Sequence, residues 1–331
     1  MIKRIVVLAV IVTMVASIPE LMAAQKKLAQ TGFQFLSVVS DACGGAMADA
    51  MTAYPTKSNS LFFNPANMAN LPNTFDVTFS QNEWIADIKH QTFSGAYRPW
   101  MGKYGVFGFS FQNVDYGDIQ GTMVWGNTDG FIDTEVLNPS SFALGFGYAL
   151  ALSDKFAVGG QVKYVKQYYG KSVTLDREYN RDVKKYVESI MAFDFGTIFK
   201  TGFKSLTFGM SIRDFSGEAK LEEDAFQLPL MFKMGLSINT FDFVMPDQQE
   251  QVLFASIDAV HPRDYPEYVN FGLEYGLKKM LFLRGGYMLN HEEYNLTYGI
   301  GIQYMGISFD YSNTPFDEFD NIQRLTMRFS L

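Results

Sequence analysis

The chain has 331 residues, of which 47% are hydrophobic, 19% charged and 16% aromatic. This balance excludes a disordered chain, and the net charge of −8 disfavours nucleic acid as a partner, because phosphate binding needs a basic surface. A single cysteine, Cys43, excludes an intrachain disulfide and a cysteine-rich zinc site.

Residues 1–24 have the layout of a secretory signal peptide. Lys3 and Arg4 precede an apolar run over 5–16, and Ala23 and Ala24 are small residues suited to cleavage. A membrane anchor fits less well, because the run is shorter than the ~20 residues that a spanning helix needs. The exported chain is therefore expected to be a soluble periplasmic β-protein or a barrel in the outer membrane.

Residues 25–73 lack strand alternation. The stretch 42–53 consists mostly of small residues, and the pair Asn64-Pro65 follows it. Small residues allow close packing against other backbone, so this segment could fill a barrel as a hatch. A periplasmic tail with a turn at Asn64-Pro65 is an equally good reading of the residues alone.

Residues 74–331 alternate with a period of two, which is typical of β-strands. About fourteen segments do so: 75–80, 86–98, 107–111, 142–150, 156–164, 193–195, 206–213, 230–238, 251–260, 269–275, 281–287, 296–304, 307–311 and 324–331. One face is large and apolar, and the other carries Gly, Ala, Ser, Thr and scattered charge. An even number of strands with this contrast predicts a transmembrane antiparallel up-and-down barrel, apolar toward lipid and polar toward its lumen.

The connections between these segments support the same fold. Long connections are expected at 114–138, 170–186, 214–228, 288–294 and 312–320, and the opposite ones are mostly short, with 242–250 as the exception. Long connections outside and short turns inside are typical of outer-membrane barrels.

Several charged residues fall on the predicted lumen face: Lys163, Asp194, Arg213, Lys233, Glu274, Arg284 and Arg328. They could bind a peptide or loop, but mutual pairing that stiffens the barrel is the favoured interpretation, because inward charge is normal in such barrels. The three histidines form no pair with a nucleophile, and no metal or phosphate motif occurs. We therefore expect no enzyme, no catalytic residue, no metal and no cofactor.

Two short motifs carry a family resemblance. The stretch 44–53 with 61–67 resembles the N-terminal signature of FadL-type barrels. The run 82–88, Asn-Glu-Trp-Ile-Ala-Asp-Ile, is more particular, and with 104–109 and 115–117 it resembles the PorV/PorQ family of outer-membrane proteins. The resemblance covers the whole mature chain.

The resemblance implies a FadL-like barrel of fourteen strands over 74–331, with a hatch over 25–73. It also implies candidate binding residues in the two motifs, namely Asn64, Pro65, Asn82, Trp84 and Asp87. The implied setting is the lipid of a Gram-negative outer membrane.

The implied function is a component of type IX protein secretion that binds the translocon, a sortase or the C-terminal domains of cargo. The sequence does not separate a PorV-like role from a PorQ-like one. The alternative is a FadL-like channel for uptake of hydrophobic small molecules, with a structural barrel or adhesin as a weaker option.

Overall fold

The computed structural model describes residues 31–175, 181–221, 224–245, 250–291, 295–316 and 320–331. Within these residues, fourteen strands form one closed antiparallel barrel, in the order β1-β18-β17-β16-β15-β14-β13-β12-β9-β8-β7-β6-β3-β2. The expected signal peptide, 1–24, lies outside the described residues. None of the described helices is long and apolar enough to cross a membrane.

The barrel strands are mostly eight to twelve residues long, and β7 and β8 have twenty each. Their bounds are β1 Phe75–Glu83, β2 Lys89–Tyr97, β3 Val106–Asp115, β6 Ser140–Ala151, β7 Phe156–Leu175, β8 Arg181–Lys200, β9 Thr207–Ser216, β12 Met231–Asn239, β13 Gln251–Pro262, β14 Tyr268–Leu277, β15 Leu281–Leu289, β16 Leu296–Tyr304, β17 Ile307–Thr314 and β18 Ile322–Ser330.

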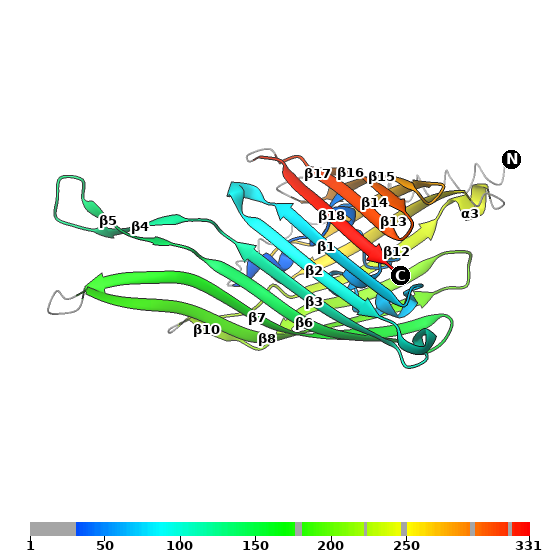
Figure 1. Cartoon of the computed structure of the whole chain (residues 1–331), viewed down its shortest axis with the longest axis horizontal. Helices are drawn as coiled ribbons and strands as arrows, with labels where there is room; N and C mark the ends of the chain where they lie inside the picture. The colour runs from blue at the N-terminus through cyan, green and yellow to red at the C-terminus, as the bar shows by residue number, and fades with distance from the viewer. Residues whose placement is uncertain (1–30, 176–180, 222–223, 246–249, 292–294, 317–319) are drawn as a thin grey trace.

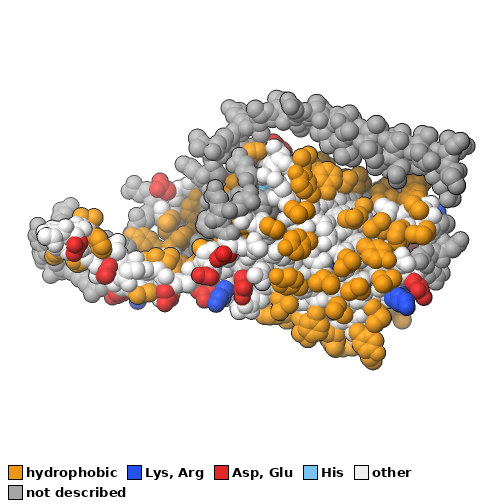
Figure 2. All heavy atoms as spheres, turned by 90° about the horizontal axis from the view of Figure 1, so that it is seen from above, with side chains coloured by type: hydrophobic (Ala, Val, Ile, Leu, Met, Phe, Trp, Pro, Cys, Tyr) orange, Lys and Arg blue, Asp and Glu red, His pale blue; other side chains and the backbone are white. Residues whose placement is uncertain are grey.

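The two faces of the wall differ as the alternation predicts. On β1, Asp76 and Thr78 point inward and are buried, whereas Phe75 and Phe79 point outward and are 48% and 47% exposed. Figure 2 shows hydrophobic side chains spread over the outside of the barrel, with charged side chains at both margins. The apolar outer surface and polar interior are those of a membrane-spanning barrel.

The two ends of the barrel have different connections. At one end lie the start of β1, the end of β18 and mostly short turns such as 152–155 and 305–306. We call this the periplasmic end and the opposite one the outer end, because short turns face the periplasm in such barrels. The exception expected at 242–250 includes the helix α3, Phe241–Val244, at the periplasmic end.

Three expected outer connections are partly strand. The connection expected at 114–138 contains a separate hairpin of β4, Ile119–Val124, and β5, Phe131–Leu137. The connection expected at 170–186 is largely the extension of β7 and β8, which project past the barrel (Figure 1). A small hairpin of β10, Ala219–Leu221, and β11, Asp224–Phe226, follows β9.

The hatch, described here over residues 31–73, lies inside the barrel (Figure 1). Its short helices are η1 Gln34–Ser37, α2 Ala42–Ala46, η2 Ser58–Phe62 and η3 Pro65–Asn70; η4 Ile85–Asp87 and η5 Pro99–Gly102 lie in wall connections. At the outer end, the Thr31 hydroxyl donates to the Asp264 carboxylate. At the periplasmic end, the Ser58 N–H donates to the Asp76 carboxylate. The hatch therefore crosses the lumen along its length.

Candidate functional site

The hatch packs directly against the backbone of the wall. A side-chain carbon at Gly159 on β7 would lie 2.6 Å from backbone atoms of Pro65 and Ala66, and one at Gly209 on β9 would lie 2.6 Å from the Thr52 carbonyl oxygen. Both separations are shorter than a van der Waals contact, so only glycine fits at these positions. The small residues that alternate along the strands thus make room for the hatch.

Polar groups of the wall hold the irregular backbone of the hatch. The Asn82 amide donates to the Val39 carbonyl (2.8 Å), Gln112 donates to Phe35 (2.9 Å), and Thr92 donates to Ser40 (3.0 Å). Non-helical backbone buried inside a barrel needs such partners, because an unpaired peptide group is costly away from water.

The motif Asn64-Pro65 joins the hatch to β8 and β7. The Asn64 side chain donates to the carbonyls of Thr52 (2.9 Å) and Thr197 (3.1 Å) and accepts from the Ala66 N–H (3.1 Å). Pro65 begins η3, where its missing N–H removes no helical bond. This arrangement anchors the hatch to the wall.

The motif at 82–88 lies elsewhere, at the outer end between β1 and β2. Asn82 is buried against the hatch, whereas Trp84 is half-buried, with its ring 5.6 Å from the Arg324 guanidinium and 6.1 Å from the His90 ring. Asp87 is exposed in a turn with positive φ. The five candidate motif residues therefore occupy two separate places and form no single site.

The predicted lumen charges all belong to the inner wall, and most are paired. Lys163 binds both Asp194 (2.9 Å) and Asp214, and Lys233 binds Asp49 of the hatch. Arg213 donates to the Leu36 carbonyl of the hatch (3.0 Å), and Arg328 donates to Thr78 (3.1 Å). The pairs bind strand to strand and wall to hatch.

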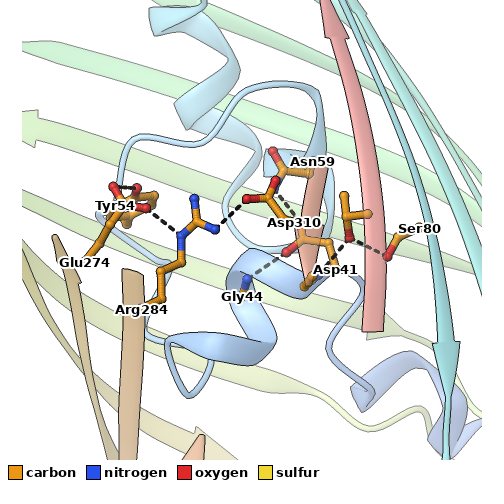
Figure 3. A network of polar contacts seen from close by, with 10 residues as sticks. Asp41, Gly44, Tyr54, Asn59, Ser80, Glu274, Arg284 and Asp310 are labelled. Atoms are coloured by element: carbon orange, nitrogen blue, oxygen red, sulfur yellow. Dashed lines mark hydrogen bonds and ion pairs between the residues drawn. The ribbon is translucent and has the colours of Figure 1, made fainter. Parts of the chain in front are cut away.

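Besides the ion pairs of Lys163 and Lys233, a cluster of polar side chains centres on Arg284 of β15 (Figure 3). Its guanidinium donates to Glu274 on β14 (2.6 Å) and to Asp310 on β17 (2.5 Å), and Tyr54 of the hatch donates to the other oxygen of Glu274 (2.6 Å). Asp41 caps α2 by accepting from the Gly44 N–H (2.7 Å) and also accepts from Asn59. The cluster connects three strands to the hatch.

Sequence reasoning missed some partners of these lumen charges. Asp49, Asp41 and Tyr54 lie in the hatch, where no alternation assigns a face. Asp214 was expected in a connection, but it lies on β9, where a bulge places it and Arg213 together opposite Asp194. The break in alternation at Arg213-Asp214-Phe215 is the signal that could have revealed the bulge.

A cavity of about 570 Å³ opens at the outer end above the hatch. Apolar and aromatic side chains supply much of its lining, among them Phe35, Trp84, Ile88 and Tyr268, with Asp49 and Asp264 among the polar residues. This volume is in the range of small-ligand pockets.

The closed fourteen-stranded barrel, its apolar outer surface and its internal hatch define a plugged β-barrel of the outer membrane. The family model of the type IX secretion system protein PorV matches residues 21–257. The chain therefore belongs to the PorV family, and it is an outer-membrane barrel component of type IX protein secretion. The family and fold are those of secretion and transport barrels.

Solved structures agree on the fold. The toluene transporter TbuX of Ralstonia pickettii is 12% identical (TM-score 0.57, 88% of this chain and 98% of that chain). The monoaromatic hydrocarbon channel CymD is 10% identical (TM-score 0.59, 88% of this chain and 97% of that chain). A FadL homologue of Pseudomonas aeruginosa is also 10% identical (TM-score 0.53, 88% of this chain and 98% of that chain). No curated protein matches the chain.

Proposed function

We propose that the barrel serves type IX secretion as a plugged, non-catalytic scaffold whose outer end binds a protein partner: the translocon, a sortase or the C-terminal domain of cargo. The buried hatch supports a plugged lumen, because it packs against the strands and is ion-paired to them. Family membership supports association with the secretion system.

The observation that carries this proposal is the β4–β5 hairpin. It forms its own two-stranded sheet between β3 and β6 and projects past the barrel (Figure 1). Five of its large apolar side chains are exposed: Ile119, Val124, Trp125, Phe131 and Val136. Grouped exposed apolar side chains with open strand edges favour contact with another protein, including pairing with a β-domain.

A pull-down from the native host tests this proposal. The tagged chain is extracted from outer membranes in mild detergent, and its partners are identified by mass spectrometry. The double variant Val124→Asp/Phe131→Asp should recover at least tenfold less of the secretion partner than the unaltered chain does. Gly126→Asp adds charge to the same hairpin, at a position where an added side-chain carbon would meet no atom within 4 Å, and should retain the partner.

Recovery of the translocon or of cargo C-terminal domains would favour a PorV-like role, and recovery of a sortase would favour a PorQ-like role. If only the barrel is recovered from a host that makes type IX components, the proposal fails.

The outer cavity favours a second candidate function, uptake of hydrophobic small molecules. Its lining by Phe35, Ile85 and Ile88 suits an apolar ligand resting on the hatch. Liposomes containing the protein should then take up labelled fatty acid faster than empty liposomes. Equal uptake by the two preparations would remove this candidate.

The surroundings of the histidines support the non-catalytic part of the proposal. His90 is buried in the lumen beside the Trp84 ring, His261 pairs with Glu267 at the outer end (2.8 Å), and the His291 ring lies 5.4 Å from that of Tyr268. These contacts fit side chains that pack or pair at the outer end. A hydrolase screen with ester and peptide substrates should give no turnover above the background.

A further inference from the structure

The outer face of β7 and β8 changes character at a defined height. On β8, four of the five outward side chains from Phe199 to Met191 are large and apolar, the exception being Thr197, and the next outward position is Ser189. The eight residue steps from Phe199 to Met191 rise about 26 Å along the strand. A tilt of ~40° reduces this to about 20 Å, near the ~25 Å of an apolar membrane band.

Above this band the same face carries lysines. Lys166 on β7 lies opposite Ser189, in the first row beyond Met191 and Tyr164. Higher up, Lys171 on β7 lies directly opposite Lys185 on β8. Directly opposed like charges destabilise a strand pair, so this pair is costly unless an anion lies nearby.

These three lysines have no ion pair among the described residues. The Lys185 ammonium lies 5.0 Å from the centre of the Tyr168 ring. Tyr168 lies one row closer to the membrane than Lys185. The Lys185 ammonium is therefore drawn toward the lipid boundary.

Another part of the wall, β2 and its neighbours β1 and β3, provides a contrast. Lys89 on β2 also points outward near the outer end, but Glu83 lies directly opposite it on β1 and Asp115 directly opposite it on β3. Its charge is thus compensated within the wall. In a chain of net charge −8, Lys166, Lys171 and Lys185 thus form a basic strip on β7 and β8 at the height where lipid headgroups begin.

We propose that Lys166, Lys171 and Lys185 form a binding strip for the phosphate groups of an anionic lipid in the outer leaflet. The apolar rows below the strip hold the acyl chains, Lys166 meets the phosphates nearest the hydrocarbon, and Lys171 and Lys185 meet the headgroup above it. An acidic protein is less favoured as the ligand, because the strip continues directly from the lipid-facing surface.

Native mass spectrometry of the full chain tests the strip. Delipidated protein in mild detergent is titrated with bis-phosphorylated lipid A, with the same lipid after dephosphorylation, and with inorganic phosphate. Each lysine near an anionic surface contributes about fivefold. The triple variant Lys166→Gln/Lys171→Gln/Lys185→Gln should therefore bind lipid A at least tenfold more weakly, and the control Lys89→Gln should match the unaltered chain.

Heat-dependent migration on gels verifies that each variant is a folded barrel. Unchanged lipid A binding by the folded triple variant would overturn the proposal, as would equal binding of the dephosphorylated lipid. Displacement of lipid A by an equal concentration of inorganic phosphate would show a free-phosphate site and overturn the lipid assignment. If the variant loses a co-purifying protein while keeping lipid A, the strip is a protein interface and the proposal is wrong.

Discussion

Lys163 on β7 binds the carboxylate of Asp214 on β9, although β8 lies between the two strands. The bulge in β9 makes this contact possible, because it turns both Arg213 and Asp214 into the lumen opposite Asp194. Asp214 has a φ of 61°, a conformation that Asp adopts more readily than most residues. One local irregularity thus completes an ion cluster across three strands.

This cluster predicts that two substitutions within it have unequal effects. Asp214→Asn leaves Lys163 bound to Asp194 at 2.9 Å, so it should lower the free energy of unfolding by about 1–3 kcal/mol. Lys163→Met leaves Asp194 and Asp214 buried without a cation and should cost about 3–5 kcal/mol. Urea unfolding in lipid vesicles measures both, and equal losses would contradict the assignment of Lys163 as the centre of the cluster.

The Arg284 cluster gives a second prediction. Arg284→Met leaves Glu274 and Asp310 buried without their shared donor, and should lower stability by about 3–5 kcal/mol. The triple variant Arg284→Met/Glu274→Gln/Asp310→Asn removes all three charges and should recover part of that loss. A triple variant less stable than the single one, measured by the same urea unfolding, would show that the charges do more than compensate one another.

Alternation was enough to predict the barrel but not its contents. Asp76 and Phe79 could be assigned to opposite faces because a strand side chain has only two directions. Asp49 and Tyr54 could not be placed, because the hatch has no periodicity and tertiary contacts alone fix its path. Asp214 was misplaced because a bulge breaks the period on which the assignment depends.

The hydrogen bonds of Asn64 are expected to stabilise the position of the hatch against the wall. Asn64→Asp replaces the amide donor that bonds the carbonyls of Thr52 and Thr197 by an acceptor, and should cost about 2–4 kcal/mol. Asn70→Asp is the matched control, because that side chain meets the Lys200 ammonium at an exposed position. Thermal unfolding followed by gel migration should show a lower midpoint for Asn64→Asp only, and a comparable fall in both variants would contradict the anchoring role.

Cys43 is a built-in reporter of hatch position. It is the chain's single cysteine and is buried in α2, and this burial raises the pKa of its thiol. Maleimide needs both access and thiolate, so the folded protein should react at pH 8 at least a hundredfold more slowly than the unfolded chain.

Gly159→Ala tests whether close packing keeps the hatch in place. The added carbon would lie 2.6 Å from the backbone of Pro65 and Ala66, so η3 must move away from β7. Labelling of Cys43 should then accelerate by about tenfold or more, which corresponds to a loss of ~1.4 kcal/mol in the hatch alone. Gly126→Ala meets no atom within 4 Å and should leave labelling unchanged. Slow labelling of a folded Gly159→Ala barrel would mean that the wall yields instead of the hatch, because β7 can then bend outward while α2 stays buried.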